Sequence, residues 1–241
     1  MQSDAGKRAT LYLVPNLLGA VAPAEVLPTR TIEVARRLEH WVVETPKAAR
    51  AFLKSLEVPR PIAELELAAL AADGDPRAVQ HALATLRNGH DVGMLSDAGC
   101  PGIADPGATL VAAAHAHDVR VVPLVGPSAI LLALMASGMN GQQFCFHGYL
   151  PVKPAARDAT LRALEQQSRA QRRTELFIET PYRNAALLQA LAQSLAPGTR
   201  VCVAADLTLA TETIDCRTAA AWRGDDGRRF ERRPAIFLLQ A

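Results

Sequence analysis

A glycine-rich loop between an apolar segment and an alanine-rich segment constrains the fold of this chain most strongly. Residues 92–95 are a short apolar run typical of a buried strand. Residues 96–107 (SDAGCPGIADPG, the signature loop) contain three glycines and two prolines, and residues 108–117 form an alanine-rich segment that is predicted to be helical. Glycine and proline leave a rigid, bare backbone that a ligand can approach closely. Strand, loop and helix in this order predict a pocket at the carboxyl ends of the strands of a parallel α/β sheet.

The residues of the signature loop limit which ligand it can bind. Gly102 and Gly107 have the spacing of a phosphate-binding loop, but residues 108–109 are Ala-Thr where such a loop needs Lys-Ser or Lys-Thr. Asp97 and Asp105 flank the turn instead, which favours hydroxyls, amines or a positively charged ligand. Asp105 is followed by a proline, and this pair predicts the start of the next helix. From these residues alone, an ordinary tight connection between strand and helix explains the loop equally well.

Strands and helices are predicted to alternate through the first half of the chain, which indicates an α/β domain with a mostly parallel sheet. Strands are predicted at residues 10–14, 40–44 and 119–125, the last as a β-branched run buried on both sides. Helices are predicted at residues 29–39, where Thr29 is the expected cap, at 48–56, and at 77–87 after a turn at 73–76. In the second half, strands are predicted at 143–149, 174–179, 200–205 and 235–239, and helices at 155–173 and 184–195.

The signature loop resembles the motif Ser-Asp-Ala-Gly-x-Pro-x-Ile-x-Asp-Pro-Gly of the tetrapyrrole (corrin/porphyrin) methylase superfamily. Within that group it most resembles the ribosomal RNA small-subunit methyltransferase I family, which methylates a cytidine ribose 2′-oxygen in 16S RNA. The resemblance implies an α/β fold of two αβα domains with a cofactor cleft between them. Residues 1–125 would form the first domain, with a mostly parallel sheet, and residues 126–241 the second, with a mixed sheet.

Segments outside the signature loop carry the same resemblance and imply a site for S-adenosylmethionine. Residues 126–129 match a family segment that links the domains and lines the cofactor cleft, and residues 143–151 match a further motif. The residues that the resemblance implies as cofactor contacts are Pro15, Ser96, Asp97, Ala98, Gly99, Cys100, Pro101, Gly126, Ser128, Ala129, Glu179, Thr180, Pro181, Leu207, Thr208, Pro234 and Ala235. From the residues alone, Ser128 is equally well explained as a helix cap.

The reaction implied by the resemblance is direct displacement at the methyl group, in which the enzyme mainly aligns the acceptor with the methyl carbon. A hydroxyl acceptor needs a base, and Asp97 and Glu179 are the candidate catalytic residues. Hydrogen bonding within the loop or to the cofactor is the alternative role for each, and the better supported one.

The chain departs from the ribosomal family at several positions, so three functions stay open. The family patterns are not matched at residues 16–18, residues 45–47 and Ala205. The helix that is dense in lysine and arginine in the family carries fewer of these residues here. The first function is methylation of RNA, the second is methylation of a small molecule such as a tetrapyrrole, and the third is binding of S-adenosylmethionine or RNA without catalysis. A net charge of +2 does not by itself indicate nucleic acid.

Three arginines are the sequence's best candidates for contact with RNA phosphates. Arg162, Arg169 and Arg173 are spaced seven and four residues apart, which predicts one helical face. Such a stripe suits phosphate contacts. A solvated helix surface explains it as well.

Cysteine and histidine spacing predicts neither a disulfide framework nor a metal site. Cys100, Cys145, Cys202 and Cys216 are far apart and are interpreted as reduced, mostly core residues. His115 and His117 would not share a helical face. Residues 1–8 show no leader, and the chain contains no apolar run long enough to span a membrane, so a cytoplasmic location is expected. The resemblance also implies a homodimer.

Overall fold

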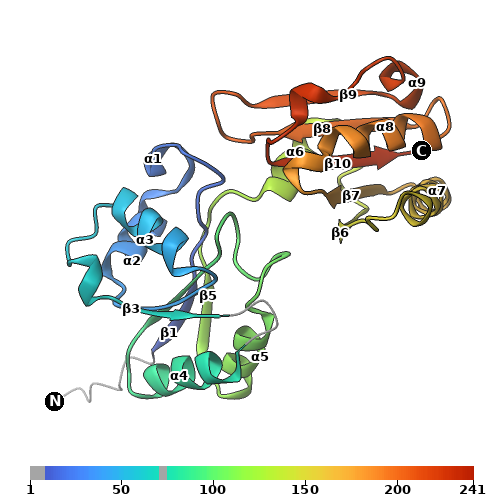
Figure 1. Ribbon diagram of the computed structural model, residues 1–241. Helices are drawn as coiled ribbons and strands as arrows, with labels where there is room; N and C mark the ends of the chain where they lie inside the picture. Colours follow the sequence, from blue (N-terminus) through green and yellow to red (C-terminus); the bar gives the residue numbers. More distant parts are fainter. Residues whose placement is uncertain (1–8, 71–74) are drawn as a thin grey trace. The chain divides into compact units, whose positions relative to one another are not determined.

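The computed structural model describes residues 9–70 and 75–241, and the chain divides into two compact units (Figure 1). The first unit ends at Ser128 and the second begins at Ala129, three residues after the boundary expected near residue 125. Residues 126–127 belong with the first unit because a Cβ atom on Gly126 would lie 2.4 Å from the ring of Pro15. The predicted turn at residues 73–74 and the expected absence of a leader at residues 1–8 concern segments outside the described residues.

The first unit is built on a five-stranded, wholly parallel sheet. Its order is β3-β2-β4-β1-β5, and every neighbouring pair is parallel. The strands are β1 (Thr10–Leu13), β2 (His40–Val43), β3 (Glu66–Ala69), β4 (Val92–Leu95) and β5 (Arg120–Pro123). The helical segments are α1 (Pro23–Val26), α2 (Thr29–Arg37), α3 (Pro46–Ser55), the 3₁₀ turn η1 (Ile62–Glu64), α4 (Pro76–Arg87) and α5 (Ala108–Ala116). The predicted alternation and parallel sheet are confirmed.

Alternating strand residues supply two separate cores, one on each face of this sheet. Tyr12 and Trp41 pack with residues of α2 and α3, whereas Leu11 and Val42 pack with residues of α4 and α5. Gly93 makes room for Trp41, because a Cβ atom there would lie 2.6 Å from the indole ring. Both faces are therefore covered, as expected of a parallel sheet.

Three local predictions in this unit are wrong. β5 pairs only with β1, so it is an edge strand with exposed and half-buried residues rather than a strand buried on both sides. Helix α5 begins at Ala108 as expected, but Gly107 occupies its N-cap position, so Asp105 does not cap it. Thr29 is the first residue of α2, and Pro28 occupies the cap position.

The second unit contains a mixed five-stranded sheet of order β6-β7-β10-β8-β9. β6 is parallel to β7, and the other neighbouring pairs are antiparallel. The strands are β6 (Phe144–Tyr149), β7 (Thr174–Ile178), β8 (Arg200–Ala205), β9 (Thr213–Thr218) and β10 (Ala235–Gln240). The helical segments are α6 (Ala129–Ser137), α7 (Pro154–Gln171), η2 (Pro181–Arg183), α8 (Asn184–Ser194), α9 (Ala219–Trp222) and η3 (Arg228–Phe230).

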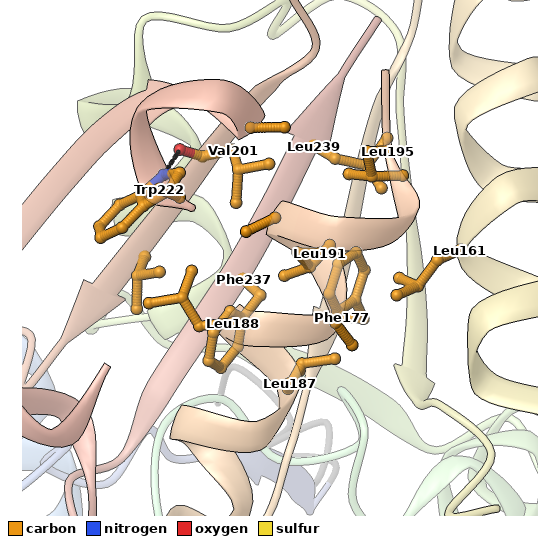
Figure 2. Packing of buried hydrophobic residues seen from close by; sticks show 14 of the residues in the cluster. Leu161, Phe177, Leu187, Leu188, Leu191, Leu195, Val201, Trp222, Phe237 and Leu239 are labelled. Atoms are coloured by element: carbon orange, nitrogen blue, oxygen red, sulfur yellow. Dashed lines mark hydrogen bonds between the residues drawn. The ribbon is translucent and has the colours of Figure 1, made fainter. Parts of the chain in front are cut away.

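A large hydrophobic cluster of the second unit lies on one face of its sheet, beneath α8 (Figure 2). Phe177 of β7 and Phe237 of β10 are fully buried, with nearly parallel rings and centroids 6.3 Å apart. Trp222 is also fully buried, and its indole N–H donates to the carbonyl of Val201 at 3.0 Å. This hydrogen bond satisfies the one polar atom that the tryptophan carries into the core.

Two further predictions about the second unit need correction. Helix α7 ends at Gln171 and Arg172 is left-handed, so Arg173 lies outside the helix and cannot share a face with Arg162 and Arg169. Of the four cysteines, Cys202 alone is buried, because Cys145 and Cys216 lie on edge strands and Cys100 lies in a loop. Among the described residues, no helix combines the length and hydrophobicity that crossing a bilayer requires.

Candidate functional site

The loops that follow the parallel strands of the first unit gather at one edge of its sheet. Backbone hydrogen bonds continue beyond the strands, from Val14 N–H to the Met94 carbonyl at 2.9 Å and from Glu44 N–H to the Leu95 carbonyl at 3.1 Å. A third joins Leu124 N–H to the Leu13 carbonyl at 2.9 Å. Since all five strands run in the same direction, the signature loop lies beside the loops after β1, β2 and β5.

Asn16 anchors the signature loop. Its side-chain amide donates to the carbonyls of Ser96 at 2.9 Å and Asp97 at 3.0 Å, and its backbone N–H donates to the carbonyl of Gly99 at 2.8 Å. The side-chain oxygen Oδ1 of Asn16 accepts from Leu17 N–H at 2.8 Å. Asn16 is buried, so these bonds are shielded from water. Sequence reasoning missed this role, because Asn16 is one of the positions at which the chain departs from the family's first loop.

Glycines give the signature loop a backbone that other residues rarely adopt. Gly99 has φ +68° and Gly107 has φ +138°. A Cβ atom on Gly107 would lie 2.6 Å from the terminal methyl of Met94. The loop can therefore turn closely over the end of β4 only with glycine at these positions.

Three carboxylates gather along the same edge. The carboxylate of Glu44 accepts from Asp97 N–H at 2.9 Å, and Asp97 Oδ1 accepts from the hydroxyl of Thr45 at 2.8 Å and from its N–H at 3.1 Å. Burial, and next the charge of Glu44, raise the pKa of Asp105 to about 6, although a hydrogen bond from Ser96 opposes the rise. The edge is thus rich in acceptors and negative charge, as the flanking aspartates predicted.

The structure brings together the predicted contact residues of the first unit. The predicted residues of the signature loop, 96–101, lie beside Pro15, whose ring packs on Gly126. The thiol of Cys100 also donates to the carbonyl of Pro127 at 3.5 Å. Ser128 ends this unit, and Ala129 begins α6 in the second unit.

The predicted contact residues of the second unit also meet at one edge of their own sheet. Residues 179–181 follow β7, residues 207–208 follow β8, and residues 234–235 lead into β10, which is antiparallel to both. Arg232 N–H donates to the carbonyl of Pro181 at 2.9 Å, and Asp206 N–H donates to the carbonyl of Pro234 at 2.9 Å. Three segments that are distant in the sequence therefore converge.

Ionic contacts fix two of these segments. Glu179 Oε1 accepts from the Arg183 guanidinium at 2.6 Å and from Thr180 N–H at 2.6 Å. Glu179 is buried, and its hydrogen bond raises the pKa of Arg183. Asp206 accepts from Arg233 Nε at 2.8 Å. Because Arg183 and Thr180 both hold Glu179 Oε1, the Glu179 carboxylate is better suited to positioning the loop than to removing a proton.

Three buried polar atoms near the same edge lack a hydrogen-bond partner among the described residues. They are Thr208 Oγ1, Arg183 Nε and Asn184 Oδ1. Thr208 also has φ +73°, a conformation that is rare for threonine. Buried polar atoms are normally paired, so these atoms are available for a ligand.

Comparison with known proteins identifies the family of this chain. The model of the tetrapyrrole (corrin/porphyrin) methylases matches residues 20–220. The chain belongs to this family. The resemblance predicted from the signature loop is therefore confirmed.

Several tetrapyrrole methylase relatives share one name, ribosomal RNA small subunit methyltransferase I. The protein of Escherichia coli O157:H7 is 31% identical over 95% of this chain and 77% of its own length, and that of Xylella fastidiosa is 34% identical over 95% and 80%. The protein of Micromonospora olivasterospora is 39% identical over 80% of this chain, which spans 58% of that relative's length.

Two solved structures confirm the fold of the tetrapyrrole methylase type. The methyltransferase CobJ has a TM-score of 0.62 at 19% identity, covering 96% of this chain and 93% of its own. A cobalamin biosynthetic enzyme, cobalt precorrin-4 methyltransferase CbiF, has a TM-score of 0.60 at 14% identity, covering 96% and 94%.

Proposed function

We propose that the protein is an S-adenosylmethionine-dependent methyltransferase that acts on a ribose 2′-oxygen in RNA of the small ribosomal subunit. The observation that carries the proposal is the carboxylate-rich signature loop, held by Asn16 at the carboxyl edge of a parallel sheet. Relatives with the ribosomal RNA methyltransferase name match 80% to 95% of the chain and support the RNA substrate.

The donor set of the first unit fits S-adenosylmethionine. This cofactor carries a sulfonium and an ammonium group, and the negative charges of Glu44, Asp97 and Asp105 attract both. It also carries ribose hydroxyls, which can donate hydrogen bonds to carboxylates. Gly99 leaves the backbone bare for close approach. When bound, S-adenosylmethionine supplies an electrophilic methyl group.

The second unit offers further cofactor contacts. The unpaired hydroxyl of Thr208 and Nε of Arg183 fit a ligand that bears polar groups. The proposed contacts of this unit are Ala129, Glu179, Thr180, Pro181, Leu207, Thr208, Pro234 and Ala235.

Methyl transfer to a hydroxyl forms an oxygen–carbon bond and releases the hydroxyl proton, which a base must accept. Asp97 is the better of the two predicted candidates, because it is exposed and its side chain accepts both hydrogen bonds from Thr45 through Oδ1. Glu179 is buried in an ion pair. We therefore assign proton transfer to Asp97 and positioning to Glu179.

Exposed cations on α7 suit the phosphates of an RNA acceptor. Arg162 and Arg169 are exposed and seven residues apart on one helix, whereas Arg173 is bound to Glu175 at 2.6 Å and contributes little. We expect the double variant Arg162→Gln with Arg169→Gln to weaken RNA binding uniformly and to lower its salt dependence.

We also infer a homodimer, supported by the 79% exposure of Met135 on α6. A cytoplasmic location is inferred as well, because it suits a ribosomal substrate.

Titration calorimetry with S-adenosylmethionine tests the cofactor assignment. Wild type and the control Glu33→Gln, which alters an exposed carboxylate on α2, should bind alike, and Asp97→Ala with Gly99→Val should lose binding. Absence of binding by folded wild type would overturn the proposal. Transfer of the methyl group to a tetrapyrrole alone would favour the small-molecule alternative, and tight binding without turnover on any acceptor would favour a binding protein.

A further inference from the structure

A cysteine, a histidine and a glutamate gather on β6 and β7, in the second unit. Cys145 lies opposite Glu175 in the register of the two strands, and His147 follows Cys145 by two residues. One ligand atom from each residue lies within 4.8 Å of the others. We propose that Cys145, His147 and Glu175 bind a divalent metal ion of the zinc class.

The distances fit a tetrahedral site after small side-chain movements. Bonds of about 2.0–2.3 Å from zinc to nitrogen, oxygen and sulfur place tetrahedral ligands about 3.3–3.6 Å apart. His147 Nε2 and Glu175 Oε2 now share a hydrogen bond of 2.7 Å, so they need to separate by roughly half an ångström. The irregular pairing of β6 between Phe146 and Tyr149 gives His147 this freedom.

The surroundings of Glu175 already have the arrangement of a metal ligand. Its side chain is fully buried, and Oε1 accepts from Arg173 Nε at 2.6 Å, which leaves Oε2 toward His147. Arg173 is in turn held by Gln171 Oε1 at 2.6 Å and Gln167 Oε1 at 2.7 Å. Hydrogen bonds of this kind orient ligating carboxylates in known metal sites.

The ligand types select the metal. Thiolate and imidazole favour zinc and related ions over magnesium and calcium, which prefer oxygen ligands throughout. β6 is an edge strand, and the side chain of His147 is 22% exposed, so an ion can enter from solvent and keep a water as its fourth ligand. The nearby Arg173 cation offsets one anionic ligand, and we therefore expect weaker binding than at a cysteine-rich zinc site.

Metal binding at this site needs no oxidant or reductant. The metal forms bonds to sulfur, nitrogen and oxygen, the thiol proton of Cys145 passes to solvent, and the imidazole proton of His147 moves to its other nitrogen. The bound ion would join edge strand β6 to β7. The sequence did not reveal this site, because Glu175 is distant from Cys145 and His147 in the chain and only the strand register brings it beside them.

The test is a titration of the full-length, tag-free protein with Co²⁺, followed by competition with Zn²⁺. Wild type should bind one equivalent, show cobalt–thiolate charge-transfer absorption and lose it to Zn²⁺. Cys145→Ser should abolish that absorption, and His147→Gln should weaken Co²⁺ binding more than about tenfold, since even outer-shell partners contribute that much.

Two matched controls and one structural measurement keep the result decisive. Cys216→Ser and His117→Gln remove the same residue types elsewhere and should bind Co²⁺ as wild type does. Circular dichroism checks that each variant is folded. Failure of wild type to retain either ion, or a charge-transfer band that survives in Cys145→Ser, would overturn the proposal.

Discussion

Replacing Asn16 by alanine tests whether the anchoring of the signature loop supports cofactor binding. The variant removes three side-chain hydrogen bonds, two to loop carbonyls and one from Leu17 N–H. At about 1 kcal/mol for each bond, and more where a buried group is left unpaired, the free energy of unfolding should fall by about 2–4 kcal/mol. Because the carbonyls of Ser96 and Asp97 lose their donors, we expect S-adenosylmethionine affinity to fall by about tenfold or more, which is about 1.4 kcal/mol.

Asn140 supplies a matched control in the second unit. Its side chain also makes three hydrogen bonds to backbone groups, those of Arg172, Gln142 and Gln143. Asn140→Ala should therefore lower stability while leaving cofactor affinity unchanged. Calorimetric titration of both variants, with urea unfolding of each, separates the two effects. Wild-type affinity in Asn16→Ala, or an equal loss in Asn140→Ala, would refute the reasoning.

Three further predictions concern single residues. Gly107→Ala should lower the free energy of unfolding by about 1–3 kcal/mol in urea titrations, because φ is +138° and the new Cβ would meet Met94; wild-type stability would contradict this. The pKa of Asp105 is raised to about 6 in the folded protein, whereas an unfolded chain has an ordinary aspartate pKa. The folded protein therefore keeps the Asp105 proton to higher pH, and its free energy of unfolding falls as the pH rises between these two pKa values. Asp105→Asn should accordingly gain stability relative to wild type between about pH 4 and about pH 7, and a constant difference in unfolding free energy would exclude the shift. A hydrogen bond from Cys202 lowers the pKa of Cys216 to about 7, so alkylation followed by mass spectrometry should modify Cys216 before Cys100, and Cys202→Ala should slow it.

The sequence predicted the parallel sheet and the signature loop well because both rest on local patterns. The apolar run at residues 92–95 forms a strand that is buried throughout, as its composition predicted. The glycines of the loop adopt positive φ angles, which glycine accepts more readily than other residues. Periodicity did not reveal that β5 is an edge strand, because a strand's place in a sheet depends on its partners. β9 carries polar residues along an exposed edge and was not predicted for the same reason.

Site residues that act through distant partners were harder to find. Asn16 binds a loop 80 residues away, and its importance depends on contacts rather than on a motif. Asp105 was expected to cap α5, yet Gly107 occupies the cap position, and the Asp105 carboxylate instead lies within the influence of the Glu44 charge. Arg173 was expected on a helix face, but the left-handed Arg172 ends the helix and turns it toward Glu175.

The most direct test of the central claim is transfer of a labelled methyl group from S-adenosylmethionine to unmodified small-subunit ribosomal RNA. Nuclease digestion of the product locates the label on base or ribose. Our account predicts label on a ribose 2′-oxygen with wild type and with Glu33→Gln, and its loss with Asp97→Ala and Gly99→Val combined. Absence of label in RNA with folded wild type that binds S-adenosylmethionine would contradict the account.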